Sequence, residues 1–222
     1  MRILAVADEE CPALWDYYVP GRLKEYDLIL SCGDLKASYL SFLVTMARCP
    51  VLYVHGNHDG SYDRKPPHGC DCLEDRLVIY NGVRILGLGG CVRYRPGPHQ
   101  YTQAQMRKRI RKLRWKLWLA KGVDIVVTHA PPEGMGDLED NAHQGFAAFR
   151  ELLEKYQPQY LLHGHSHMNY GVHQPREHTC GNSRVINVGE RWTLDVEEGT
   201  FREKQRDKLL WVGRPPKQED DL

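Results

Sequence analysis

The chain has 222 residues, of which 41% are apolar and 27% carry a formal charge. These proportions are those of an ordinary globular protein, and they exclude a disordered, fibrous or collagen-like chain. The formal net charge of +1 argues against a surface built wholly for nucleic acid or another polyanion, although a local basic patch is compatible with it. The length predicts one domain over residues 1–212, because it allows one large core but not two full-sized domains.

The sequence shows no membrane-targeting segment. The apolar run between Met1 and Asp8 is too short for a signal peptide, and no later run approaches the ~20 residues of a membrane span. Seven cysteines are an odd number, and without an export signal we expect reduced thiols rather than disulfides. We therefore predict a cytoplasmic protein with no membrane partner.

Five short apolar runs with strand character each lead into a residue that can bind a metal. The runs are 3–7 before Asp8, 28–30 before Asp34, 51–54 before Asn57, 123–128 before His129, and 160–162 before His165 and His167. Stretches with helical periodicity lie between them at 35–48, 101–121 and 145–156. This alternation indicates an α/β fold, in which the carboxyl ends of neighbouring strands open onto one crevice. We expect the five strand ends to converge there.

The donor atoms at these strand ends are carboxylates, an amide and imidazoles, without a thiolate. Any one of them alone is more often a cap or turn residue than a ligand. Together they suit Zn, Fe or Mn, and they differ from the cysteine sets of structural zinc sites. Two divalent ions about 3.5–4 Å apart can hold both the attacking and the leaving oxygen of a displacement at phosphorus. The predicted site is therefore catalytic.

Four motifs in the chain match, in order and spacing, those of a known family. They are Gly33-Asp34, Gly56-Asn57-His58-Asp59, Thr128-His129 and Gly164-His165-Ser166-His167. These motifs resemble those of the calcineurin-like metallophosphoesterases, and the joint occurrence of GNHD and GHSH is highly specific. The resemblance runs from Asp8 to His167, about three quarters of the chain. It implies an α/β fold, namely a four-layer α/β/β/α sandwich of two mixed β-sheets flanked by helices.

The resemblance also implies a dinuclear metal site and a role for each matching residue. The implied ligands are Asp34 as the bridge, Asp8 and His167 for the first ion, and Asn57, His129 and His165 for the second. His58 would donate a proton or hydrogen bond to the leaving oxygen, and Asp59 would orient the His58 ring. The implied reaction is hydrolysis of a phosphate mono- or diester by direct attack of a metal-bridging hydroxide, without a phosphoenzyme.

The first motif departs from the family pattern. The family usually has Asp-x-His, whereas this sequence reads Asp8-Glu9-Glu10. Glu10 would still coordinate the first ion, but its negative charge favours a harder ion such as Mn²⁺, while Fe and Zn²⁺ stay open. The alternative is that Glu10 turns away and leaves the first site weak or empty.

Three residues are weaker candidates for contact with the substrate. Arg93 and Arg95 lie in the loop 89–101, where a guanidinium would grip a phosphate oxygen, although solvated surface arginines explain them equally well. His143 follows a Pro- and Gly-rich segment behind His129 and is expected near the mouth of the site. His55 and His163 lie in or beside strand runs, so we interpret both as packed core imidazoles.

The most basic stretch of the chain is the predicted helix 103–121. Its cations are Arg107, Lys108, Arg109, Arg111, Lys112, Arg114 and Lys116, and its apolar stripe is Met106, Ile110, Leu113 and Leu117. Trp115 falls on the polar side, where it would stack on a base while the cations bind phosphates. A charge run is more often a solvated face, however, so nucleic acid is the less favoured partner.

The C-terminal part predicts two strands at 185–188 and 193–196 that finish a sheet. From 213 to 222 the sequence is Pro-rich and acidic, and it predicts a flexible tail. Two functions follow from the whole pattern: a hydrolase with a phosphate-ester substrate, or a weakly catalytic protein-binding scaffold on the same fold. His58 and the near-complete ligand set favour the hydrolase, whereas Glu10 keeps the scaffold open. The sequence leaves substrate, metal and oligomeric state undecided.

Overall fold

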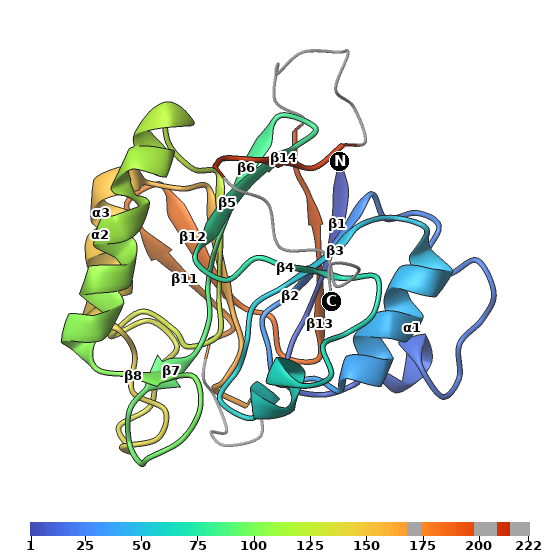
Figure 1. Cartoon of the computed structure of the whole chain (residues 1–222), viewed down its shortest axis with the longest axis horizontal. Helices are drawn as coiled ribbons and strands as arrows, with labels where there is room; N and C mark the ends of the chain where they lie inside the picture. Colours follow the sequence, from blue (N-terminus) through green and yellow to red (C-terminus); the bar gives the residue numbers. More distant parts are fainter. Residues whose placement is uncertain (168–174, 198–207, 214–222) are drawn as a thin grey trace.

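Two β-sheets lie face to face, with helices on their outer sides (Figure 1). The computed structural model describes residues 1–167, 175–197 and 208–213. The first sheet has the order β13-β1-β2-β3-β4. Its four consecutive members are parallel, and β13 is antiparallel to β1. Their bounds are Arg2–Val6 (β1), Leu28–Ser31 (β2), Val51–Tyr53 (β3), Asp71–Cys72 (β4) and Arg191–Asp195 (β13).

The second sheet has the order β11-β12-β10-β9-β6-β5-β14. Its four central strands, β12, β10, β9 and β6, are parallel, and the outer three are antiparallel to their neighbours. The bounds are Arg76–Tyr80 (β5), Val83–Leu88 (β6), Ile125–Thr128 (β9), Tyr160–His163 (β10), Glu177–Cys180 (β11), Ser183–Asn187 (β12) and Leu210–Trp211 (β14). A separate pair joins β7 (Cys91–Val92) to β8 (Gln100–Tyr101).

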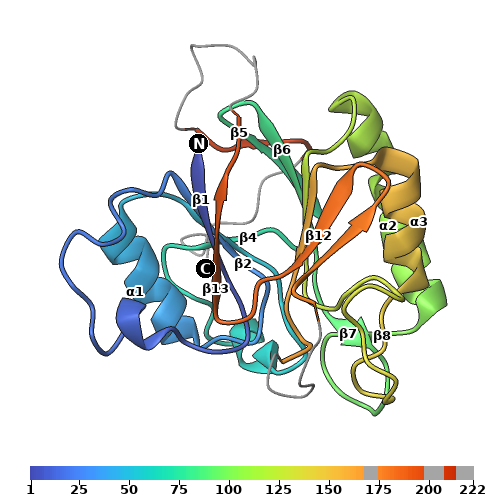
Figure 2. The ribbon, with the colours of Figure 1, turned by 180° about the vertical axis from the view of Figure 1, so that it is seen from behind.

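Three helices cover the outer faces of the sheets. The helix α1 (Ala37–Ala47) packs on the first sheet through Tyr39 and Leu43, whereas α2 (Gln103–Leu119) and α3 (Ala147–Tyr156) pack on the second. Seen from behind, α1 and the α2–α3 pair lie on opposite sides of the molecule (Figure 2). Short 3₁₀ helices are η1 (Pro12–Leu14) and η2 (Asp59–Asp63).

The core has three layers, as expected for four layers of secondary structure. Alternate residues of each strand face opposite sides, so Leu30 and Val127 point between the sheets while Ile29 and Val126 point towards the helices. The central strands β2, β9 and β10 are buried on both faces, which explains their continuous apolar runs. The predicted α/β/β/α sandwich is confirmed.

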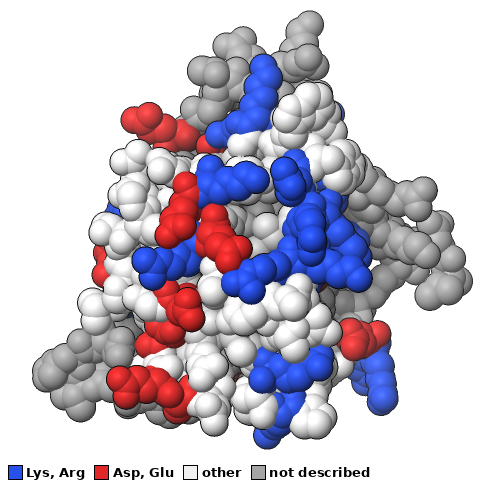
Figure 3. Space-filling view, turned by 90° about the vertical axis from the view of Figure 1, so that its left-hand side faces the viewer, with Lys and Arg blue, Asp and Glu red and all other residues white. Residues whose placement is uncertain are grey.

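The helix α2 forms where its sequence predicts it. Thr102 caps it, because the Thr102 hydroxyl accepts from the Gln105 amide while the Gln105 side chain accepts from the Thr102 amide. Met106, Leu113 and Leu117 are buried, and Trp115 is 51% exposed. Lysines and arginines gather over this helix (Figure 3).

One residue of the basic run does not contribute to that exposed charge. The Arg109 side chain is only 11% exposed. Its guanidinium lies over the Tyr101 ring, 4.2 Å from the centroid, and forms ion pairs with Glu74 and Asp75. Arg109 is therefore a structural residue, which a count of charges along the helix does not reveal.

Three further features of the chain are its lack of an apolar spanning helix among the described residues, its thiols and its C-terminal tail. Across the described ranges, no helix has the length and apolar content that crossing a bilayer requires. All seven cysteines are free, as the sequence predicts. The predicted tail lies outside the described residues except for Gly213.

Candidate metal centre

The five predicted strand ends meet at one edge of the two sheets. Asp8, Asp34 and Asn57 follow β1, β2 and β3 of the first sheet, while His129 and His165 follow β9 and β10 of the second. Contacts cross between the sheets here, because the His165 amide donates to Asp8 Oδ1 at 2.9 Å. One donor atom each from Asp34, His129 and His165 lies within 4.8 Å of the other two. The convergence predicted from sequence is found.

Three of these residues have left-handed backbone conformations. The φ angles are 64° at Asp8, 57° at Asp34 and 67° at His165. This region is unfavourable for residues other than glycine and costs of order 1–3 kcal/mol each where it is imposed. The surrounding structure therefore stores backbone strain at the site.

The glycines of the motifs allow the loops to approach one another. A Cβ on Gly56 would lie 2.0 Å from Asp34 Oδ1, and one on Gly33 would lie 2.4 Å from the Gly56 nitrogen. A Cβ on Gly164 would lie 2.7 Å from Asp8 Oδ1. The Gly-Asp, GNHD and GHSH motifs therefore need glycine because a carboxylate or backbone occupies the space of a side chain.

Electron-pair donors converge around His129 Nε2. The ring's Nδ1 lies 2.8 Å from the Cys32 carbonyl oxygen, to which it donates. Nε2 then faces two acceptors, Asn57 Oδ1 at 3.0 Å and Asp34 Oδ2 at 3.3 Å. Burial opposes a charge on His129, but the Asp34 carboxylate outweighs it and raises the pKa of His129 to about 9. Such an arrangement requires positive charge, and a divalent cation fits it.

Two further groups have the form that a metal ligand requires. His165 Nε2 donates to the Ala142 carbonyl at 2.8 Å, and burial followed by the charge of His129 lowers the pKa of His165 to about 3. The ring is neutral, with its other nitrogen available. Asp8 Oδ2 is buried without a hydrogen-bond partner, and burial raises the pKa of Asp8 to about 6. Both residues fit a cation site.

The bridge candidate Asp34 is fixed as an anion. Burial opposes its ionisation, but His129 and the His58 amide, which donates to Asp34 Oδ1 at 2.8 Å, hold the pKa of Asp34 below its ordinary value. The Asp34 backbone is in turn held by Asp59, whose Oδ2 accepts from the amides of Asp34 and Gly56 at 2.8 Å each.

Asp59 thus joins the two metal-binding loops. Burial, together with the charge of Asp34, raises the pKa of Asp59 to about 6. The Asp59 carboxylate accepts hydrogen bonds from backbone amides, and its role in orienting the His58 ring stays a prediction. The His58 side chain is exposed at the mouth of the site.

The two remaining ligand candidates lie at the rim. Glu10 Oε1 accepts from the Lys36 amide at 3.1 Å, and Glu10 Oε2 lies 3.5 Å from Lys36 Nζ. His167 Nδ1 lies 3.6 Å from Glu9 Oε1. The Glu10 carboxylate is therefore already engaged with Lys36, and its assignment as a ligand stays a prediction.

The weaker substrate candidates divide into two groups. The His143 ring lies 5.1 Å from the His165 ring, centroid to centroid, and its Nδ1 pairs with Asp140 at 2.9 Å. Arg93 instead donates to the Gln100 carbonyl and the Gln105 side chain, and Arg95 lies over the Tyr94 ring. Only His143 contacts a predicted metal ligand.

Residues that the sequence analysis did not identify as part of the site hold the backbone next to it. The buried Glu74 carboxylate pairs with Arg109 and accepts from the amides of His55 and Gly89. This network fixes the backbone two residues before Asn57. No periodicity or motif predicts it, because its members are far apart in sequence.

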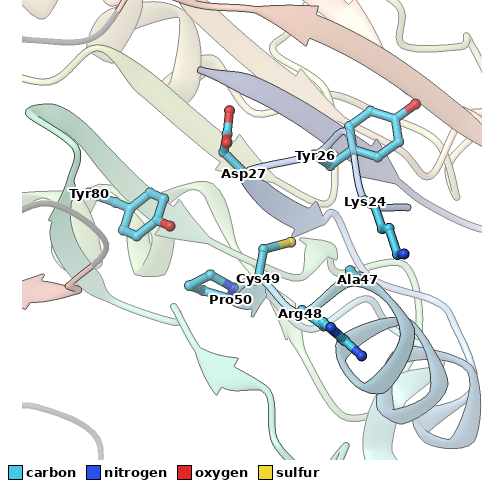
Figure 4. A pocket seen from close by; sticks show the side chains of 8 residues that line it. All are labelled: Lys24, Tyr26, Asp27, Ala47, Arg48, Cys49, Pro50 and Tyr80. Atoms are coloured by element: carbon cyan, nitrogen blue, oxygen red, sulfur yellow. The ribbon is translucent and has the colours of Figure 1, made fainter. Parts of the chain in front are cut away.

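A hollow in the described surface lies elsewhere. Its volume is about 480 Å³, and its lining comes from segments that precede β2 and β3 and from Tyr80 (Figure 4). Lys24, Asp27 and Arg48 line it, at the amino ends of the parallel strands. It therefore lies at the opposite edge from the metal ligands and does not belong to the site.

The sequence also matches the model of a known protein family. The family model described as calcineurin-like phosphoesterase matches residues 2–169. The chain belongs to this family. As a calcineurin-like phosphoesterase, it has the fold and the motif order that its sequence predicts, and the match spans every strand end of the candidate site.

Two animal proteins are similar to this chain over part of their length. Metallophosphoesterase domain-containing protein 1 of Homo sapiens is 31% identical over 123 residues, which are 54% of this chain and 36% of the human protein. A UPF0046 protein of Caenorhabditis elegans is 24% identical over 198 residues, which are 74% of this chain and 64% of that protein. The chain thus spans between about one third and two thirds of the length of these relatives.

Solved structures support the fold of this calcineurin-like phosphoesterase. A crystal structure from Thermus thermophilus aligns with a TM-score of 0.59 at 19% identity, covering 85% of this chain and 89% of that one. A structure described as a putative 5′-nucleotidase from Staphylococcus aureus aligns with a TM-score of 0.54 at 15% identity, covering 89% of this chain and 51% of that one. At such identities the likeness concerns the fold alone.

Proposed function

We propose that this protein is a metal-dependent phosphoesterase that hydrolyses a phosphate mono- or diester at a dinuclear site. The observation that carries the proposal is the convergence of His129 Nε2, Asn57 Oδ1 and Asp34 Oδ2, which only a cation or an added proton satisfies. Membership of the calcineurin-like phosphoesterases supports the same chemistry.

The proposed ligands are those that the family pattern implies. They are Asp34 between the two ions, Asp8, His167 and Glu10 for the first, and Asn57, His129 and His165 for the second. When bound, the ions would lower the pKa of water to supply a nucleophile and would neutralise charge on the phosphate. An extra carboxylate at Glu10 favours Mn²⁺, since hard cations prefer oxygen ligands.

The protein's own side chains would position the ester and complete the proton transfer. His58 is exposed and its amide donates to Asp34 Oδ1, which supports a role for its ring in donating a proton to the leaving oxygen. His143, beside His165, would face the substrate from the opposite loop. Asp59 would act indirectly, by holding the loops of Asp34 and Gly56 together.

A protein-binding scaffold is the competing function. The Glu10–Lys36 contact favours it, because a Glu10 side chain held by Lys36 would weaken the first metal position. The retained His58 and the converging donors favour catalysis instead. Metal-dependent turnover separates the two functions.

The first experiment measures hydrolysis of bis-p-nitrophenyl phosphate and p-nitrophenyl phosphate by chelator-stripped protein after addition of Mn²⁺, Mg²⁺, Zn²⁺ or Fe²⁺. We expect turnover with Mn²⁺ and a loss of about 10²–10⁴-fold in His58→Ala, because a general acid contributes about that much. Metal content in His58→Ala should equal that of the wild type. His68→Ala, an exposed histidine on another loop, serves as the matched control.

The outcomes distinguish the two functions. Turnover that needs metal and His58 supports the phosphoesterase, and the diester-to-monoester ratio then narrows the substrate class. Protein that binds no metal and hydrolyses neither ester would support the scaffold. Equal activity of His58→Ala and wild type would remove His58 from the mechanism.

A further inference from the structure

A second group of metal-binding side chains lies beside the strand-end site and shares no residue with it. His55 follows β3, Asp63 ends η2, and His99 lies in the loop between β7 and β8. One nitrogen of each imidazole and one carboxylate oxygen of Asp63 lie within 4.8 Å of one another. Through the described part of the chain, only this trio and the trio of Asp34, His129 and His165 bring three such side chains together.

Two ring nitrogens of this cluster are buried without a hydrogen bond. They are His55 Nδ1 and His99 Nε2. Glu74 Oε2 lies 3.5 Å from His55 Nδ1, which is an ion-pair contact rather than a hydrogen bond. A buried polar atom left unsatisfied destabilises the folded state, and such atoms in folded proteins call for an ion or an ordered water. Binding of an ion or a water molecule to these two nitrogens would therefore stabilise the folded state.

The backbone around the cluster is held in place before any ion binds. The His55 amide donates to Glu74, and the His55 carbonyl accepts from the Gly90 amide at 2.7 Å. The loop of His99 packs closely on η2, since a Cβ on Gly60 would lie 2.8 Å from Pro98 Cγ. His99 itself has a φ of 49°, the left-handed conformation, which its short loop imposes. Three segments thus meet at fixed positions.

The two imidazoles need one local movement to bind a common ion. Their rings are stacked, with centroids 4.3 Å apart and planes 13° apart. A nitrogen lone pair lies in the plane of its ring, so two stacked rings cannot both point at one ion. Rotation of the His99 ring about its Cβ–Cγ bond, a broad torsion, removes this obstacle without a change of backbone.

We propose that His55, Asp63 and His99 form a further divalent-cation site, separate from the dinuclear centre. Two imidazoles and one carboxylate are a ligand set of the kind that Zn²⁺ takes in proteins, with water at the open positions. The ion would join the loop before β8 to η2, the helix that begins at Asp59. From the sequence, His55 is interpreted as a packed core imidazole because it lies beside a strand run, and its neighbour His99 is distant in the chain.

The test counts Zn²⁺ per chain after equilibrium dialysis of chelator-stripped, reduced full-length protein, using inductively coupled plasma mass spectrometry. We expect His99→Ala and Asp63→Asn each to bind one Zn²⁺ fewer than the wild type. Asp63→Asn is exposed and conservative, so it tests the site without disturbing the core. His68→Ala is the matched control, and it should bind as many ions as the wild type. Circular dichroism verifies that each variant is folded.

The difference between wild type and variant is independent of the dinuclear centre. If the proposed phosphoesterase site bound no metal, the loss of one ion in His99→Ala would still be measured. Equal counts in the wild type, His99→Ala and Asp63→Asn would overturn the proposal, and an ordered water would then explain the two nitrogens. A loss of one ion in His68→Ala as well would identify adventitious binding and also overturn it.

Discussion

At the scale of single residues, two features characterise the site: a buried carboxylate oxygen without a hydrogen-bond partner, and an imidazole nitrogen that faces two hydrogen-bond acceptors. Asp8 Oδ2 is buried without a hydrogen bond, and His129 Nε2 faces two acceptors. These are costly arrangements in a protein interior. A divalent cation would make them favourable, and two of the residues concerned, Asp8 and Asp34, have left-handed backbones.

Glu10 is a predicted ligand of the first metal position. We expect Glu10→Ala to bind one ion per chain fewer than the wild type in Mn²⁺, because the position loses a ligand. Glu10→His supplies the family's usual residue and should restore the count, with a shift of preference towards Zn²⁺. Metal content by mass spectrometry measures both effects.

The control for Glu10 is Glu25→Ala, a partly exposed carboxylate paired with Arg2 outside the site. It should leave the metal count unchanged. Unchanged metal content and activity in Glu10→Ala would show that Glu10 keeps its contact with Lys36 and is not a ligand.

At the scale of elements, α2 combines two kinds of basic residue. Arg107 forms an exposed ion pair with Glu151 of α3, whereas Arg109 reaches inward to Glu74 beneath the metal loops. The difference follows from helix geometry, since two residues along a helix turn the side chain by about 200°. One charged run therefore contains both a solvated face and a buried anchor.

The two arginines form a matched pair for measuring this difference. We expect Arg109→Ala to lower the free energy of unfolding by about 3–5 kcal/mol, because it leaves Glu74 buried without its cation. Arg107→Ala should have a much smaller effect, since water screens the exposed pair. Urea denaturation measures both. Equal losses in the two variants would contradict the buried role of Arg109.

The destabilisation expected for Arg109→Ala depends on pH, and the pKa of Glu74 determines its direction. Burial opposes ionisation of Glu74, but Arg109 and His55 outweigh it and lower the pKa of Glu74 from 4.5 to about 2. A lowered pKa in the folded state contributes stability above the unfolded value of 4.5, and this contribution is lost as the pH falls towards 2. The deficit of Arg109→Ala should therefore be full above pH 4.5 and shrink below it.

At the scale of the whole molecule, the predicted metal ligands come from loops of both sheets. Asp34 and Asn57 follow strands of the first sheet, and His129 and His165 follow strands of the second. Ions bound between them would join the two halves of the sandwich. Binding to the folded state alone stabilises that state by mass action.

Removal of metal should therefore destabilise the fold. Each ion held at about 100 times its Kd adds about 2.7 kcal/mol. Since about 1 kcal/mol shifts the Tm of a chain of this size by about 2–4 °C, stripping both ions should lower the Tm by roughly 10–20 °C. Differential scanning fluorimetry with and without a chelator measures this shift. In Asp34→Asn the chelator should cause no such shift of the Tm. An identical Tm for stripped and loaded wild type would argue against two tightly held ions.

The cationic residues over α2 are a surface of the whole molecule rather than part of the site. In the described ranges, Lys108, Arg111 and Arg114 have no carboxylate within ion-pair distance, and Trp115 and Trp118 are 51% and 77% exposed. These features fit a phosphate backbone and bases. With Arg109 buried and Arg107 paired, however, the face carries less free charge than the run suggests, and nucleic-acid binding stays a prediction.

The sequence by itself determined the elements and the identity of the donors. Short runs of branched apolar residues form strands when both faces are buried, and Gly-Asp, GNHD and GHSH require glycine wherever another loop fills the space of a side chain. These signals are local in the chain. For that reason the strands that end at the site, the three helices and the types of donor atom could be predicted from it.

Only the tertiary structure decided which atoms meet. The Glu10–Lys36 contact, the two amides held by Asp59, the burial of Arg109 against Glu74 and the cluster of His55, Asp63 and His99 all join distant segments. Their geometry depends on how two sheets pack and which loops cross at their edge. No spacing in the sequence encodes a contact of that kind, because its energy arises only after the layers have assembled.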